Sequence, residues 1–222
     1  MGDRARGWPV AKEGLPFCAA GAVGWAAAVA LGWTGLGAVL GTGTVLTAWF
    51  FRNPARAVPH EPNLVVSPGD GRVLAVVEED EPRFLKERAI RVSIFLSPLN
   101  VHINRIPCEG TVTAVTHFAG RFQVASRPGA TLENEQTAVV IETDTGHRVL
   151  CVQVAGYVAR RIVTWLEPGE RVTRGERYGL IRFGSRMDVY LPTSTQMKVA
   201  SGDQVRGGTS VIGVLSGKSA LA

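Results

Sequence analysis

The chain has 222 residues, 45% of them hydrophobic, and a formal net charge of +5, a length that suits one domain of ordinary size with an appendage. It shows neither a basic stripe interleaved with aromatic residues nor a zinc-ligand spacing, which argues against nucleic acid as a partner and against a bound metal. Its three cysteines, Cys18, Cys108 and Cys151, are odd in number and widely spaced, which predicts no disulfide framework and suits a reducing compartment.

The first predicted element is residues 17–51, a run of 35 residues without a charged side chain. A bilayer span needs about 20 apolar residues, so this run holds either one long span or two short ones folded as a hairpin. Five glycines between residues 32 and 43 give a turn a place to form. We expect a helical hairpin embedded in the membrane, and the alternative is a buried helix pair of a soluble protein.

Both flanks of this run are basic, with Arg4, Arg6 and Lys12 before it and Arg52 and Arg56 after it. Basic residues prefer the cytoplasmic side, which predicts that both ends of the hairpin are cytoplasmic. Residues 1–59 carry five basic and two acidic groups, hence +3 of the total +5. The predicted organisation is a basic cytoplasmic leader (1–16), a membrane-anchoring segment (17–51) and a second domain (52–222).

From about residue 63 onward the pattern indicates β structure. Short runs rich in β-branched residues alternate with turn residues, and no convincing long amphipathic helix occurs. The clearest runs are residues 71–77, 91–96, 138–142 and 148–154. This pattern predicts a mostly β, β-rich α+β domain.

Two segments of this domain, residues 166–175 and 199–208, share Gly, Val and Gly at the same spacing, 33 residues apart. Each pattern indicates a tight turn that opens a strand, followed by a second turn. The pair resembles the hammerhead turns of biotinyl, lipoyl and sugar-permease hybrid-motif domains. We therefore expect duplicated hybrid or hammerhead-like motifs.

The dipeptide Gly184-Ser185 lies between two apolar, strand-like runs, 178–183 and 189–191. This setting resembles the self-cleaving site of the pyruvoyl-dependent phosphatidylserine decarboxylase family. Four more segments match that family in its order: residues 50–56 (FFRNPAR), 65–73 (VVSPGDGRV), 95–107 (FLSPLNVHINRIP) and 153–162 (QVAGYVARRI). Together they make the resemblance specific, and the chain length is similar to the compact bacterial and archaeal branch.

The resemblance implies a proenzyme that cuts itself into residues 1–184 and 185–222. Ser185 would attack the carbonyl of Gly184 and convert the amide to an ester. Removal of the serine α-proton would then expel the ester carboxylate and leave dehydroalanine, which hydrolyses to a pyruvoyl group and ammonia. Glycine suits the cleavage position because it lets the backbone bend toward the nucleophile. The implied cofactor is the pyruvoyl group derived from Ser185.

A serine needs a base to take its proton, and a histidine oriented by a carboxylate is the usual solution. We expect His102 to be that base, with Asp70 as its orienter, so that Ser185, His102 and Asp70 form the catalytic set. Asp70 could also be a turn residue alone. His102 is in addition the best candidate to return a proton after decarboxylation.

One position departs from the family pattern, because many members carry a second histidine where this chain has Arg105. Work assigned to two histidines there must fall to His102 or to water. Arg160 and Arg161 could bind lipid phosphate or form an exposed basic face.

The resemblance also implies a substrate, phosphatidylserine in the bilayer, converted to phosphatidylethanolamine at the cytoplasmic face of the inner membrane. The oligomeric state, a homodimer included, is left open. The alternative function is a membrane-anchored lipoyl- or biotinyl-like carrier or adaptor without catalysis. The spacing does not fit such a carrier, whose modified lysine lies well before the Gly-Asp-x-Val turn, because Lys198 lies only four residues before Gly202.

Overall fold

The computed structural model describes residues 9–121, 133–156, 161–181 and 184–216. It divides into two compact units, Met1–Ala55 and Arg56–Ala222. Part of the predicted leader and Arg160 lie outside the described residues. Because each unit is compact by itself, we describe them in turn.

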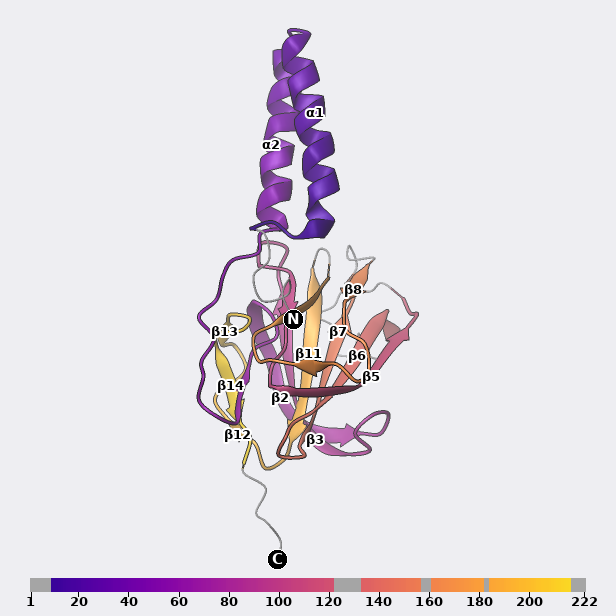
Figure 1. Ribbon diagram of the computed structural model, residues 1–222, viewed down its shortest axis with the longest axis vertical. Helices are drawn as coiled ribbons and strands as arrows, with labels where there is room; N and C mark the ends of the chain where they lie inside the picture. Colours follow the sequence, from indigo (N-terminus) through magenta and orange to yellow (C-terminus); the bar gives the residue numbers. More distant parts are fainter. Residues whose placement is uncertain (1–8, 122–132, 157–160, 182–183, 217–222) are drawn as a thin grey trace, which may run out of the picture. The chain divides into compact units, whose positions relative to one another are not determined.

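The first unit is a pair of apolar helices (Figure 1). A 3-10 turn, Lys12–Gly14, leads into α1 (Leu15–Ala30), and α2 is Thr34–Phe50. The tight turn between them contains Gly32 at φ 73°, in the left-handed region that glycine adopts readily. Two helices joined by a short turn agree with the predicted helical hairpin.

Glycines bring the two helices close together. A Cβ added at Gly21 would lie 2.3 Å from Thr44 Oγ1, and one at Gly41 would lie 3.1 Å from the Trp25 ring. The Thr44 hydroxyl donates to the Leu40 carbonyl at 2.7 Å, so its proton is satisfied within its own helix. By length and composition, the helical stretch Lys12–Ala30 could cross a membrane, whereas α2 is shorter.

The second unit consists of short strands, as the sequence predicts, and every pairing among its described strands is antiparallel. The strands are β1 (Leu64–Val66), β2 (Gly71–Glu81), β3 (Glu87–Leu96), β4 (Ile103–Arg105), β5 (Gly110–Phe118), β6 (Gln136–Glu142), β7 (Arg148–Val154), β8 (Ile162–Thr164), β9 (Arg171–Val172), β10 (Arg177–Ile181), β11 (Ser185–Pro192), β12 (Gln196–Met197), β13 (Gln204–Val205) and β14 (Val211–Val214).

These strands form one large sheet and two small ones. The large sheet has the order β13-β2-β3-β11-β7-β6-β5-β9, and the small sheets have the orders β4-β10-β8 and β1-β14-β12. Strand β11 therefore lies in the middle of the large sheet, between β3 and β7 (Figure 1). The predicted runs at 71–77, 91–96, 138–142 and 148–154 all fall on strands of this sheet.

The main hydrophobic core covers one face of the large sheet. Alternate residues of β11, namely Met187, Val189 and Leu191, belong to it. Tyr190 belongs instead to a second cluster on the opposite face, together with Leu150 and others. This alternation follows from the strand period of two, and it places Ser185 on the core face with Met187.

The two segments predicted to repeat share their turn geometry. Gly169 and Gly175 have φ of 91° and 77°, and Gly202 and Gly208 have φ of 100° and 77°. A two-residue strand, β9 or β13, lies between the glycines in each case. This likeness is local, and the duplication of a hammerhead motif stays a prediction.

Candidate active site

The Gly184–Ser185 pair lies where the chain passes from one sheet to another. Strand β10 ends at Ile181 in the small sheet, and β11 begins at Ser185 in the large one. Gly184 has a φ of 63°. A Cβ there would meet nothing closer than Pro98 Cγ at 3.8 Å, so the backbone conformation, rather than crowding, calls for glycine.

Ser185 is fully buried at the start of β11, opposite Leu96 of β3. Within the ranges that the structure describes, its Oγ has no hydrogen-bond partner. A buried hydroxyl without a partner costs about 1–3 kcal/mol, so the fold maintains it against its own stability. Such a group is a candidate for chemistry rather than for structural support.

His102 is 3% exposed and directly precedes β4. Its carbonyl accepts a hydrogen bond from Ile181 N at 3.3 Å, at the end of β10. The segment that carries it also supplies Leu96 opposite Ser185 and Pro98 beside Gly184. The predicted histidine segment therefore flanks the chain on both sides of the Gly184–Ser185 bond.

Asp70 lies in the turn before β2, and both of its carboxylate oxygens are engaged. Oδ2 accepts from Arg56 Nη2 at 2.7 Å, and Oδ1 accepts from Gly207 N at 2.8 Å. The side chains of Arg56 and Asp70 are 13% and 18% exposed. Asp70 therefore does more than form a turn, because both contacts are distant in sequence.

The aspartate turn is also tied to the histidine segment. Asn100 Nδ2 donates to the Asp70 carbonyl at 3.2 Å, and Arg105 N donates to the Pro68 carbonyl at 2.8 Å. These bonds fix the turn next to the segment that contains His102. The roles of Ser185 as nucleophile, His102 as base and Asp70 as orienter stay predictions.

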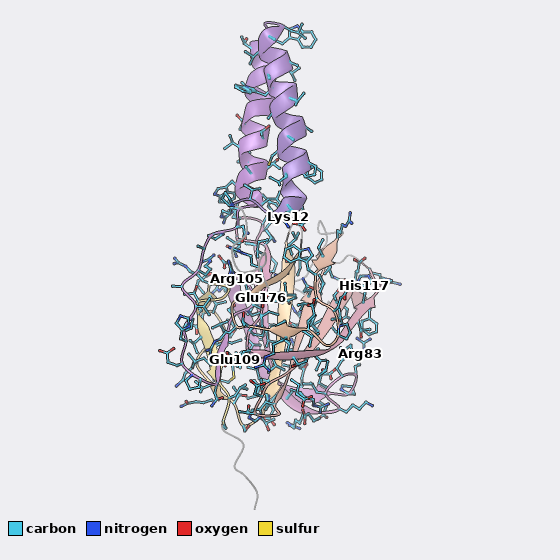
Figure 2. All side chains as sticks on the ribbon, viewed as in Figure 1. Lys12, Arg83, Arg105, Glu109, His117 and Glu176 are labelled. Atoms are coloured by element: carbon cyan, nitrogen blue, oxygen red, sulfur yellow. The ribbon has the colours of Figure 1, made fainter. Side chains whose placement is uncertain are left out.

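Arg105, the departure from the family pattern, is buried at 5% exposure. Its Nη1 donates to the Gly175 carbonyl at 2.9 Å, next to Glu176 (Figure 2). The pKa of Arg105 is lowered to about 10, chiefly by burial and also by the positive charges of Arg177 and Arg56, against the opposing effect of Asp70. The side chain thus adds positive charge around the Asp70 carboxylate rather than replacing a histidine with another base.

Two further contributions were not foreseen from the sequence. By sequence Arg56 belongs to the basic flank of the hairpin, and in the structure its side chain binds Asp70. Arg186 and Asp188, directly after Ser185, form a buried ion pair with bonds of 2.8 and 2.7 Å. Arg56 and Asp70 are 14 residues apart, so no local pattern indicates their contact. Arg186 and Asp188 lie just before the predicted strand-like run 189–191, so the sequence did not place them on one strand. Arg161 is exposed.

Comparisons with known proteins agree with this arrangement. The family model for phosphatidylserine decarboxylase matches residues 44–213. A phosphatidylserine decarboxylase proenzyme from Symbiobacterium thermophilum is 48% identical over 206 residues, covering 93% of this chain and 95% of the relative. A proenzyme of the same name from Geobacter sulfurreducens is 48% identical over 215 residues, covering 93% and 97%.

A third relative of that name, from Desulfotalea psychrophila, is 40% identical over 210 residues, which cover 92% of this chain and 96% of the relative. The family match extends over both the predicted cleavage site and the histidine and aspartate segments. A match of this identity and coverage identifies an enzyme, a decarboxylase. The chain belongs to the phosphatidylserine decarboxylase family.

Proposed function

We propose that this protein decarboxylates phosphatidylserine to phosphatidylethanolamine, after cutting itself between Gly184 and Ser185 to make a pyruvoyl group. The observation that carries the proposal is the fully buried Ser185 Oγ, without a partner among the described residues, directly after a glycine at φ 63°. The family match and the proenzyme names of the relatives support it. The carrier or adaptor alternative is not favoured, because that family match accounts for most of the chain.

The self-cleavage needs only groups of this chain and water. Ser185 Oγ attacks the Gly184 carbonyl carbon, the peptide C–N bond breaks, and the serine nitrogen becomes a free amine. Loss of the Ser185 α-proton then breaks the Cβ–Oγ bond, which leaves a carboxylate on Gly184 and dehydroalanine at position 185. Water converts that residue to a pyruvoyl group and releases ammonia. His102 would take the hydroxyl proton in the first step.

The residues around Ser185 fit such a group. After cleavage the new terminus would remain buried on β11, which is held between β3 and β7. The pyruvoyl carbonyl supplies an electron sink for the electrons that carbon dioxide leaves behind. His102, beside the end of β10, would deliver the proton that replaces carbon dioxide on the product.

The helical hairpin would anchor the enzyme to its substrate. Among the described residues, twelve of the fourteen exposed large apolar side chains lie between positions 15 and 49. An apolar surface of this kind fits lipid rather than water. At 16 and 17 residues the helices are about 24–26 Å long, close to the hydrocarbon thickness of about 30 Å. The basic flanks of the hairpin support a location of the enzyme at the cytoplasmic face of the inner membrane, because basic residues prefer that side.

The proposal is tested by incubating the purified protein with phosphatidylserine in detergent micelles and measuring phosphatidylethanolamine and carbon dioxide. We expect turnover from the native chain and none from Ser185→Ala, which should also stay full length. His102→Ala should accumulate uncut precursor. If Ser185→Ala converts the lipid at the native rate, the pyruvoyl mechanism is wrong.

A further inference from the structure

A chain of buried polar side chains crosses the core between the small and the large sheet. Gln153 Nε2 on β7 donates to Asn104 Oδ1 on β4 at 2.7 Å. The Thr164 hydroxyl on β8 donates to Gln153 Oε1 at 2.5 Å. Asn104 and Gln153 are both fully buried. The two amides therefore form a rigid bridge rather than a solvated contact.

The orientation of both amides follows from their surroundings. Gln153 Nε2 also faces the Val163 carbonyl at 3.5 Å, so this end of the side chain must be the donor and the other end accepts from Thr164. Asn104 must then present its oxygen to Gln153, which leaves its Nδ2 pointing elsewhere. Within the parts of the chain that the structure describes, that Nδ2 has no hydrogen-bond partner.

The register of the strands relates both amide residues to the strands that flank the cleavage site. Gln153 pairs with Met187 on β11, two residues from Ser185 on the same face of the sheet. In the small sheet, Asn104 pairs with Gly179 of β10, the strand that leads to Gly184. Diagonal neighbours on a sheet face are about 7–8 Å apart, within the reach of long side chains. The bridge therefore joins the small sheet to the large sheet beside Met187, two residues after Ser185.

Glycine at position 179 leaves room for the Gln153 side chain beside β8. A Cβ there would lie 2.2 Å from the Val163 carbonyl oxygen and 3.1 Å from Gln153 Nε2. Two buried polar atoms, Asn104 Nδ2 and Ser185 Oγ, have no partner among the described residues. Gln153 connects the two residues, because it binds Asn104 and lies diagonal to Ser185 across the strand pair. One is a donor, and the other is the atom whose attack creates an oxyanion.

We propose that Asn104 Nδ2 is the hydrogen-bond donor that stabilises the oxyanion formed on the Gly184 carbonyl oxygen during self-cleavage, with Gln153 and Thr164 as the residues that position it. The inference rests on the proposed self-cleavage. When Ser185 Oγ bonds to the Gly184 carbon, the carbonyl π electrons move to the oxygen, and the negative charge needs a fixed donor in a site without water. Collapse of that intermediate returns the electrons and breaks the C–N bond, with the proton from Ser185 Oγ transferred to the departing nitrogen.

The test measures the rate at which newly made precursor is converted to fragments, on denaturing gels. Removing one oxyanion donor slows such reactions roughly 10²–10³-fold, and we expect this loss for Asn104→Ala. Because that variant leaves Gln153 Nε2 only its 3.5 Å bond to the Val163 carbonyl, the double variant Asn104→Leu with Gln153→Leu replaces both partners by apolar groups of similar shape, which preserves folding better. It should fold, with a melting temperature near the native one, and cleave as slowly.

The matched control is Asn134→Ala. Asn134 is also buried, at 1% exposure, but its Nδ2 donates to the Ala155 carbonyl at 2.7 Å, so the change removes a bond to the backbone. This variant should lose stability and still cleave within a few-fold of the native rate. Cleavage of folded Asn104→Ala or of the double variant at the rate of this control would overturn the inference.

Hydroxylamine separates the two chemical stages, because it cleaves an ester that has already formed. An oxyanion donor acts before the ester, so the Asn104 variants should remain uncut when hydroxylamine is added. Rapid hydroxylamine cleavage of the variants would place the defect after the ester and contradict the assignment. If the native chain itself never cleaves, the proposed function fails. Normal native cleavage with unaffected Asn104 variants rejects this inference alone.

Discussion

The backbone N–H of Gly207 donates a hydrogen bond of 2.8 Å to Asp70 Oδ1, and the two residues lie on opposite sides of the Gly184–Ser185 bond in sequence. Three strand pairings also join residues from before and after this bond: β11 with β3, β13 with β2, and β14 with β1. Strands from after the cleavage site therefore pair with strands from before it in the same sheets.

We accordingly expect the two fragments to stay together after self-cleavage. Strand β11 is internal to the large sheet, so releasing residues 185–222 would expose the main core. Native size-exclusion chromatography in mild detergent should show both fragments in one peak, and denaturant should separate them. A small fragment that elutes alone without denaturant contradicts the expectation.

Asp70→Asn should destabilise the protein by roughly 3 kcal/mol, the lower end of what removing one partner of a buried ion pair costs. Asparagine can keep only one of the two hydrogen bonds, because its Nδ2 cannot accept, and it removes the negative charge that Arg56 binds and that acts on Arg105. Urea unfolding in a Ser185→Ala background would measure the change. The control is Glu78→Gln, whose pair with Arg88 is 49% and 61% exposed and should contribute little to stability because water screens it. Equal losses in the free energy of unfolding for the two changes would show that the buried Asp70 charge stabilises the protein no more than an exposed one.

The pH dependence of stability should change above pH 9 because of Cys108. Burial raises the pKa of its thiol from 9.0 to about 12. Between these values the unfolded chain releases the thiol proton while the folded chain keeps it, so this contribution to stability is complete below pH 9 and is lost as the pH rises toward 12. Cys108→Ala should flatten the fall of the melting temperature over this range. Val112→Ala, also a fully buried core change, should keep the native slope. Parallel curves for the native chain and Cys108→Ala would refute the explanation.

Removal of residues 1–51 should leave self-cleavage largely intact and reduce turnover on phosphatidylserine vesicles sharply. The contacts of Ser185, His102 and Asp70 described above lie within the unit that begins at Arg56, and the truncation keeps the Arg56–Asp70 pair. Without the hairpin, the enzyme must reach its lipid from water, at a cost of about 0.8 kcal/mol for each CH₂ exposed. Activity on detergent-dispersed lipid serves as the control and should change less. Equal vesicle turnover by the truncated and full chains would mean that the hairpin is not the anchor.

The sequence was sufficient for features that depend on local pattern. Turn residues and β-branched runs predicted the strands around residues 71–77 and 148–154, and glycines in an uncharged run predicted the helical hairpin. Family motifs indicated Ser185, His102 and Asp70. The structure shows that the turn with Asp70 is bonded to the segment that contains His102, and that this segment borders the chain at Gly184 and Ser185. Their roles remain to be tested.

The sequence could not reveal contacts that depend on tertiary structure. Arg56 resembles any basic residue after an apolar run, and only the fold brings it to Asp70, 14 residues away. Asn104 and Gln153 are 49 residues apart and belong to different sheets, so neither shows a pattern of its own. A buried donor without a partner is a property of packing, and it can be recognised only when its surroundings are known.

The most direct test of the account is the intact mass of freshly purified, active protein. We expect two species, residues 1–184 and 185–222, the smaller one lighter by one ammonia than its sequence and without a free amino terminus. Ser185→Ala should give one full-length species without activity. An active preparation that consists of a single uncut chain, or a small fragment that keeps its serine amine, would contradict the central claim.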